Sequence, residues 1–302
     1  MKYLISGGAG FIGSHLCDAL IKRGDSVVCV DSMITGSVRN IWHMLSIEGF
    51  ELISSDALGV RCGDIDGIFH LASPAAPADI RNYPSVTISV NRNATKYLLE
   101  YARSQSAKFL FVSTMKVHGN CERVESYIAG KRAGEEYCAE YGAKVARLAS
   151  VFGPRMALKD SRVIPVFITR ALRGQPLSLW NGGGQIDSFC YVSDIVRGII
   201  DFMDSDESGV IEFGNPEGIS IIDLAKTILH LTGSISEITT NENVTVVDEC
   251  HRIPDLQRAK EALDWNLEVN LKEGLMRTVM DFIYRTEDKP CQKETTTISA
   301  TV

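Results

Sequence analysis

KYLISGGAGFIG occupies residues 2–13, close to the beginning of the chain. Residues 3–5 are a short apolar run of the kind that forms a buried parallel strand. Gly7, Gly10 and Gly13 follow at intervals of three, and an apolar-periodic segment comes next. A strand, a glycine-rich turn and a helix in this order are typical of a dinucleotide-binding βαβ unit.

The three glycines have different expected tasks in such a unit. One allows the tight turn, the next lets the backbone approach a pyrophosphate, and the third lets helix and strand pack closely. The helix that begins near Phe11 and Ile12 presents free N–H groups and its positive end to the phosphates. A second apolar run, residues 27–30, ends in Asp31, which is placed to bind the ribose hydroxyls. No arginine follows directly, and a carboxylate repels a 2′-phosphate, so we expect NAD rather than NADP.

The alternation of strand and helix continues to about residue 150. Strands are expected at 27–30, 51–54, 67–72, 108–113 and 145–150, and helices at 85–104 and 129–141. This rhythm predicts an α/β fold with a Rossmann-type, doubly wound parallel sheet. The segment 73–80, after the strand at 67–72, is expected to line the cofactor cleft as a loop, because ligands of open α/β sheets bind beyond the strand carboxyl ends.

The second half is less regular and predicts a smaller C-terminal substrate-binding subdomain. Helices are expected at 164–173, 194–203, 221–231 with a Ser220 cap, 256–263 and 270–284. We expect residues 1–155, completed by 185–205, to form the NAD-binding domain. Residues 156–184 and 206–286 then form the subdomain, and the polar segment 287–302 is a disordered tail.

Composition limits the class of function. The 302 residues are 45% hydrophobic and 23% charged, with a net charge of −7. The acidic balance argues against nucleic acid or an anionic membrane as a partner, and no apolar run is long enough for a membrane span. A cytoplasmic location is the expectation. The eight cysteines are scattered without a CxxC pair, so we expect core residues rather than a metal site.

Three polar residues follow the strand at 108–113. Thr114 ends that strand, and Tyr127 and Lys131 lie four apart on the expected next helix, hence on one face. An ammonium beside a phenol favours the phenolate, so Tyr127 is predicted to act as a general base, with Thr114 sharing the same substrate oxygen.

A series of motifs then marks a family. They are GGAGFIGSHL at 7–16, HLASPAAP at 70–77, the Thr114, Tyr127 and Lys131 set, FGPRM at 152–156, RALRGQPL at 170–177, SFCYVSD at 188–194 and RIPD at 252–255. With these the chain resembles the extended short-chain dehydrogenase/reductases of the NAD-dependent nucleotide-sugar epimerase/dehydratase family, and within it the UDP-glucuronate decarboxylases. The resemblance covers most of residues 1–285.

The resemblance implies that Tyr127 deprotonates a sugar hydroxyl, usually at C4, while hydride passes to NAD and later returns. It implies a nucleotide sugar, most plausibly a UDP-sugar, as substrate, and a homodimer formed through helices 85–104 and 129–141. The residues it implies for the cofactor are Gly7, Gly10, Phe11, Ile12, Gly13, Asp31, Asp56, Ala57, Leu71, Ala72, Ser73, Asn91 and Lys131. Those it implies for the substrate are Pro74, Met115, Lys116, Ser150, Arg162, Trp180, Asp187 and Arg252. Within these sets, Asp31 would hold the ribose, Asp56 the adenine and Arg252 the diphosphate, where a guanidinium suits phosphate oxygens. Trp180 either stacks near the base or is a core tryptophan.

The chain departs from the decarboxylases on the sugar side. They carry Ser-Glu directly after the threonine, where this chain has Met115 and Lys116. They carry Arg where it has Asp187, which would repel a uronate, and Asn where it has Ser150. We expect Lys116 and Asp187 to form a salt bridge across the sugar site, as opposed to being two independent solvated charges.

The segment between Thr114 and Tyr127 is also shorter than in the family, which predicts an open site or one completed by another chain. Two functions therefore compete. One is an NAD-dependent enzyme that oxidises the sugar at C4, with epimerisation the most economical second step and decarboxylation the family alternative. The other is a degenerate relative that binds NAD or a nucleotide sugar without turnover.

Overall fold

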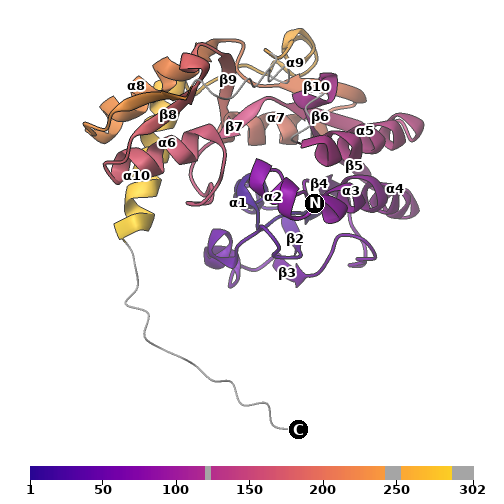
Figure 1. Ribbon diagram of the computed structural model, residues 1–302. Helices are drawn as coiled ribbons and strands as arrows, with labels where there is room; N and C mark the ends of the chain where they lie inside the picture. The colour runs from indigo at the N-terminus through magenta and orange to yellow at the C-terminus, as the bar shows by residue number, and fades with distance from the viewer. Residues whose placement is uncertain (120–123, 242–252, 288–302) are drawn as a thin grey trace.

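A computed structural model describes residues 1–119, 124–241 and 253–287, and within these ranges seven strands form one parallel sheet, the central sheet (Figure 1). Its strands are β1 (Lys2–Ser6), β2 (Ser26–Asp31), β3 (Phe50–Ser54), β4 (Gly67–His70), β5 (Lys108–Thr114), β6 (Lys144–Leu148) and β10 (Gly209–Phe213). Their order is β10-β6-β5-β4-β1-β2-β3, and the neighbouring pairs are parallel. The predicted doubly wound sheet is confirmed.

Helices cover both faces of the central sheet because its strands are apolar on both sides. In β1, Tyr3 and Ile5 face one buried cluster and Leu4 faces the other, as the two-residue period of a strand requires. The first cluster lies under α1 (Phe11–Arg23) and α7 (Val192–Asp204). The elements over the second are the π-helix η3 (Val90–Ala94), α4 (Thr95–Ser104) and α5 (Glu125–Glu140), and α3 (Pro84–Ser89) packs against α5 and η3. Cys17, Cys29, Cys138 and Cys190 are buried, as expected of core cysteines.

The cleft of the molecule follows from the strand order. From β1 the chain builds β2 and β3 on one side and then crosses to β4, β5 and β6 on the other. The connections after β1 and β4 therefore diverge, and a crevice opens beyond the carboxyl ends of these two central strands. The glycine-rich turn after β1 lies there, and Gly7, at φ +78°, packs against the backbone of Ala72 after β4.

A smaller part of the chain lies beside the central sheet (Figure 1). Its strands are β7 (Ser150–Phe152), β9 (Ile186–Tyr191) and β11 (Gly218–Ser220) in one sheet, and β8 (Leu177–Trp180) with β12 (Ile238–Asn241) in another. Its helices are α6 (Val163–Leu172), α8 (Ile221–Thr232), α9 (Gln257–Leu263) and α10 (Leu271–Glu287). The short remaining elements are η1 (Val38–Asn40), η2 (Trp42–Met44), α2 (Pro77–Asn82), η4 (Met115–His118) and η6 (Asn181–Gly183).

Several segment boundaries differ from the sequence prediction. The strand β10, inside the predicted subdomain segment 206–286, pairs with β6 at the edge of the central sheet, and β9, inside the segment 185–205, pairs with β7. Both are short strands without a strong apolar period, so their partners were not readable from the chain. The helix predicted at 129–141 begins at Glu125, and the loop predicted after Ser73 contains the helix α2. Glu287 ends α10, and the rest of the predicted tail lies outside the described residues.

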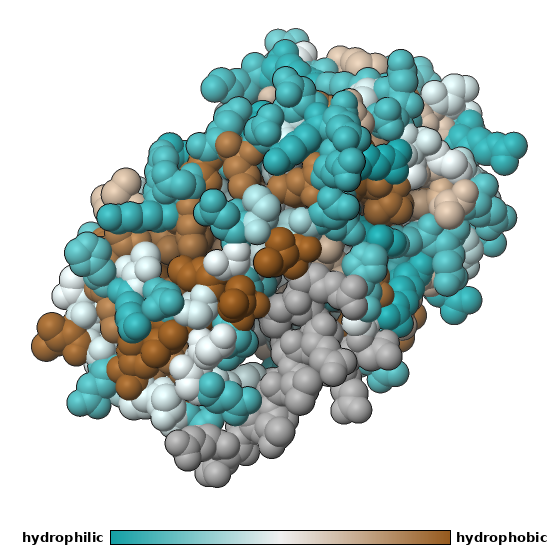
Figure 2. All heavy atoms as spheres, turned by 90° about the horizontal axis from the view of Figure 1, so that it is seen from above, coloured by the Kyte–Doolittle hydropathy of each residue, from teal (hydrophilic) through white to brown (hydrophobic). Residues whose placement is uncertain are grey.

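The surface is mixed in polarity. Figure 2 shows hydrophilic residues over most of the face seen from above, with hydrophobic patches between them. None of the helices in the described ranges is long and apolar enough to cross a lipid bilayer.

A substitution at Gly13 tests whether the glycine-rich turn requires a residue without a side chain. A Cβ added there would lie 2.9 Å from Gly8 Cα and closer still to the carbonyl oxygen of Gly7. We therefore expect Gly13→Ala to lower the free energy of unfolding by about 1–3 kcal/mol, as overpacking does. Urea denaturation measures the change. Gly184→Ala is the control, because its Cβ meets open space, and it should differ from the native protein by less than about 0.5 kcal/mol.

Candidate active site

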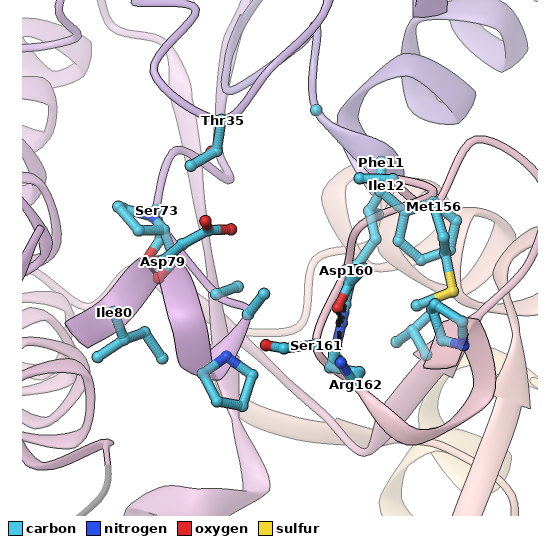
Figure 3. A pocket seen from close by; sticks show the side chains of 18 of the residues that line it. Phe11, Ile12, Thr35, Ser73, Asp79, Ile80, Met156, Asp160, Ser161 and Arg162 are labelled. Carbon is cyan, nitrogen blue, oxygen red and sulfur yellow. Dashed lines mark hydrogen bonds and ion pairs between the residues drawn. The ribbon is translucent and has the colours of Figure 1, made fainter. Parts of the chain in front are cut away.

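One cleft of about 1700 Å³ lies between the carboxyl ends of the central sheet and the smaller part. Residues predicted from sequence for cofactor, catalysis and substrate line it together. Two predicted residues do not: Asn91 lies behind the wall, and Arg252 lies outside the described residues. Figure 3 shows Phe11, Ile12, Asp160 and Arg162 on one wall, with Ser73 and Asp79 on the opposite wall.

The cofactor end of the cleft fits a dinucleotide. The first residue of α1 follows Gly10, which offers no side chain to cap the helix, so the first backbone N–H groups remain available for an anion. The Asp31 carboxylate accepts hydrogen bonds from the backbone N–H of Ala9 (3.0 Å) and Met33 (2.9 Å). These bonds fix the carboxylate beside the turn, where oxygen lone pairs remain for ribose hydroxyls. A Cβ at Gly36 would approach the Asp31 carboxylate to 2.6 Å, so this loop must also stay small.

Asn91 acts through Ser73. It lies in the π-helix η3, an element often found near functional sites. Its Nδ2 donates to Ser73 Oγ (2.8 Å) and to the Thr87 carbonyl (2.8 Å), so it holds Ser73 at the cleft. Asn91 does not itself line the cleft, and its predicted direct contact with the cofactor stays a prediction. Its buried Oδ1 has no hydrogen-bond partner among the residues described.

His70 is a buried neutral imidazole at the end of β4. Its Nε2 donates to the Val90 carbonyl (3.1 Å), because a carbonyl only accepts, and Nδ1 then accepts from Ser6 Oγ (2.5 Å). Burial, and secondly the charge of Lys131, lower the His70 pKa from 6.5 to about 3. The histidine thus joins β1, β4 and η3 beneath the cleft.

This depressed pKa predicts acid sensitivity. The unfolded chain binds a proton at His70 below pH 6.5, whereas the folded chain does not until about pH 3. The stability that neutral His70 contributes is present above pH 6.5 and is lost as pH falls towards 3, by at most about 1.4 kcal/mol per pH unit. Urea denaturation between pH 7 and 4 should show a shallower pH slope for His70→Asn than for the native protein. Equal slopes would contradict a buried neutral imidazole.

The predicted catalytic set is assembled on two elements. Thr114 ends β5, and Tyr127 and Lys131 lie on successive turns of α5, as the spacing predicted. Lys131 is buried, and its Nζ donates to the Val112 carbonyl (2.6 Å) and lies 4.5 Å from the Phe111 ring centre and 5.7 Å from that of Tyr127. Burial lowers the Lys131 pKa to about 7, and Glu135 opposes this shift. The group therefore changes charge near neutral pH.

Tyr127 is a neutral phenol in the isolated protein. Burial raises its pKa to about 12, while a hydrogen bond with Thr114 and the charge of Arg162 lower it. Arg162 is a residue whose influence on the phenol the sequence did not reveal, since 35 positions separate the two in the chain. Its guanidinium is held by Asp160, with Nε–Oδ distances of 3.0 and 3.1 Å, and lies 5.8 Å from the Phe11 ring centre.

The sugar side contains one clear correction. Lys116 and Asp187 both line the cleft, but no ion pair joins them among the described residues. Asp187 instead accepts hydrogen bonds from Ser150 Oγ (3.3 Å) and from the backbone N–H of Ser188 (2.8 Å). The predicted salt bridge is wrong: the Asp187 carboxylate lies within hydrogen-bond distance of Ser150 on the neighbouring strand β7, and no Lys116 nitrogen lies within ion-pair distance of it. Trp180 is 42% exposed at the end of β8, which excludes the core alternative.

The NAD dependent epimerase/dehydratase family model matches residues 3–214 of the chain. The chain belongs to this family. It is 36% identical over 304 residues to UDP-glucuronic acid decarboxylase 1 of Arabidopsis thaliana. The matched region covers 93% of this chain and 70% of that protein. It is 38% identical over 308 residues to UDP-glucuronic acid decarboxylase 3 of the same plant, with 94% and 90% covered.

Solved structures give the same family. UDP-glucuronic acid 4-epimerase of Bacillus cereus, solved with UDP-glucuronic acid and NAD, superposes with a TM-score of 0.85 at 26% identity and covers 94% of this chain and 100% of that one. UDP-glucose 4-epimerase of Thermotoga maritima, solved with UDP-glucose, gives 0.83 at 29%, covering 95% and 100%. The predicted family, fold class and NAD cofactor are confirmed, and the chain is an NAD-dependent sugar-nucleotide enzyme.

Two features of the cleft were missed from sequence. The backbone N–H of Ala78 donates to Ser161 Oγ (3.0 Å), so α2 and the segment before α6 meet across the opening. Asp79, in the first turn of α2, also faces the cleft. The sequence Pro-Ala-Asp at 77–79 suits a helix start, yet the surrounding prolines and alanines indicated a loop.

Proposed function

We propose that the chain oxidises the sugar of a nucleotide sugar at C4 through Tyr127 and returns the hydride after a second step, most economically an epimerisation. The observation that carries the proposal is the position of Thr114, Tyr127 and Lys131 on one wall of the cleft that also contains the glycine-rich turn. A base and a dinucleotide site in one cavity suit the removal of a hydroxyl proton together with hydride transfer.

The side chains of the chain itself carry the proton. A sugar hydroxyl between Thr114 and Tyr127 would donate its proton to the Tyr127 oxygen, and Thr114 would orient the same hydroxyl. NAD, when bound, supplies the hydride acceptor. The phenol needs help to ionise, since its pKa of about 12 lies far above neutral. Protonated Lys131 and the Arg162 guanidinium provide positive charge near the phenolate, and Asp160 keeps the guanidinium in place.

The substrate is proposed to be a UDP-sugar. The Thermotoga and Bacillus epimerases were solved with UDP-sugars, and both cover nearly the whole of this chain. Two plant proteins that resemble the chain over more than nine-tenths of its length carry the name UDP-glucuronic acid decarboxylase, so decarboxylation is the second candidate reaction. Met115 disfavours it, because a thioether sulfur has no proton to donate to a sugar carboxylate. Asp187 in the cleft adds a negative charge on the same side.

A panel of UDP-, dTDP-, CDP- and GDP-sugars tests this function. The protein is incubated with NAD and each sugar, the reduced-nicotinamide absorbance is followed, and the products are weighed by mass spectrometry. We expect transient absorbance and a product of unchanged mass. Loss of carbon dioxide would favour the decarboxylase instead. Binding without absorbance or product for every sugar would indicate the non-catalytic alternative. The homodimer, the cytoplasmic location and the domain limits stay predictions.

A further inference from the structure

The Asp79 carboxylate lies in the cleft and takes no part in holding the fold together. In Figure 3 its side chain points from α2 into the cavity, across from Asp160 and Arg162. Within the described ranges, no hydrogen bond or ion pair reaches its carboxylate. Burial, and secondly the charge of Asp160, raise the Asp79 pKa, while Arg162 lowers it. A carboxylate with a raised pKa is a stronger proton acceptor than a fully solvated one.

The other carboxylates of the cleft already have partners. Asp31 and Asp56 accept backbone N–H groups at the cofactor end. Asp160 holds Arg162, and Asp281 holds Arg285. Asp187 accepts from Ser150. Among the residues that the structure describes, Asp79 is therefore the cleft carboxylate free for a substrate.

The position of α2 brings Asp79 to the catalytic end of the cleft. Ile80, the next residue, is buried in a small apolar cluster with Val124 and Ile128, and Tyr127 packs against this cluster. The charge of Arg162 acts on both Tyr127 and Asp79, so both lie near one guanidinium. The hydrogen bond from Ala78 to Ser161 fixes this end of α2 against the opposite wall.

We propose that Asp79 is the second acid–base residue of this site and removes a proton from the sugar carbon next to the C4 ketone. The inference rests on the proposed function, which generates that ketone, and it names the second step. The C–H bond at C3 or C5 breaks, its electron pair forms the enolate with the negative charge on the C4 oxygen, and the proton joins the Asp79 carboxylate. Return of a proton from water to the opposite face of the same carbon restores the ketone with that carbon inverted, so no oxidant or further reactant is needed.

A preformed ketone tests this step apart from the oxidation. The protein loaded with NAD is incubated with UDP-4-keto-6-deoxyglucose in D₂O, and deuterium at C3 and C5 is followed by NMR and mass spectrometry. We expect deuterium uptake well above the enzyme-free rate. Asp79→Asn should reduce it on the order of 10²-fold or more, within the range of general-base contributions. Asp64→Asn, which removes an exposed carboxylate outside the cleft, should leave it unchanged.

A second variant separates chemistry from folding. Asp79→Glu keeps the carboxylate, so at equal UDP binding its uptake should exceed that of Asp79→Asn at least tenfold. Uptake by Asp79→Asn at the native rate, equal uptake by the two variants, or native uptake no faster than without enzyme would each overturn the role of Asp79. The proposed C4 oxidation is tested independently of the exchange result. It would be contradicted if no sugar of the panel produced transient reduced-nicotinamide absorbance.

Discussion

Replacing Tyr127 with phenylalanine is expected to lower turnover on the order of 10³-fold, the largest effect on activity that we predict. The change deletes one hydroxyl and leaves the ring, so the packing against the cluster of Ile80, Val124 and Ile128 is retained. What is lost is the oxygen that accepts the sugar proton and shares a hydrogen bond with Thr114. The measurement is the rate of product formation with the best sugar of the panel, together with the reduced-nicotinamide absorbance.

The control for Tyr127→Phe is available on the same helix. Tyr137 lies outside the cleft, where the Lys96 ammonium sits 5.6 Å from its ring centre. Tyr137→Phe removes the same hydroxyl from α5 and should leave turnover unchanged. NAD binding should also survive in Tyr127→Phe, because the glycine-rich turn and Asp31 are untouched. Native turnover in Tyr127→Phe would contradict its role as base.

The cofactor half of the site was predictable because its signals are local. The residues concerned lie on adjoining strands and turns: Gly7, Gly10, Gly13 and Asp31. The local backbone explains why each of these residue types is needed, and the pattern is visible in the sequence. Thr114, Tyr127 and Lys131 were equally accessible, since one helix period places the last two on one face and the strand end fixes the first. The periodicity of a sequence relates residues that are only a few positions apart. These features depend on no longer-range contact.

The sugar half was less predictable because it depends on tertiary neighbours. The parallel pairing of β7 with β9 brings Ser150 Oγ within 3.3 Å of the Asp187 carboxylate, although the two residues are 37 positions apart in the chain. The position of Arg162 near Tyr127 likewise results from the packing of the smaller part on the central sheet. Neither outcome has a signature in the spacing of the residues. The short strands involved also lack the length at which an apolar period becomes clear.

Glu135→Ala is expected to produce the largest loss of stability, about 3 kcal/mol. Glu135 lies one turn after Lys131 on α5, and its oxygens accept from Ser113 Oγ (2.5 Å) and from Arg147 Nε (2.9 Å) and Nη2 (2.5 Å). The Glu135 and Arg147 side chains are only 12% and 20% exposed, so removal of the carboxylate leaves the Arg147 guanidinium largely desolvated, with only the longer ion pair to Glu212, at 3.9 Å, among the described residues. Breaking buried pairs in this way costs about 3–5 kcal/mol, and the partial exposure favours the lower end. Urea denaturation at pH 7 measures it.

The Glu135→Ala substitution is also expected to change the pKa of Lys131. A purely structural contact between Glu135 and Arg147 would not have this effect. Glu135 raises the pKa of Lys131 against the effect of burial. Without it the pKa falls below about 7, so the ammonium that supports the Tyr127 phenolate is lost at a lower pH. The high-pH limb of any Lys131-dependent activity should therefore shift to lower pH in Glu135→Ala. Glu273→Ala breaks an exposed pair with Arg277 and should cost no more than about 0.5 kcal/mol without moving the pH profile. If both variants lose equal stability and neither shifts the profile, Glu135 does not couple the sheet to Lys131.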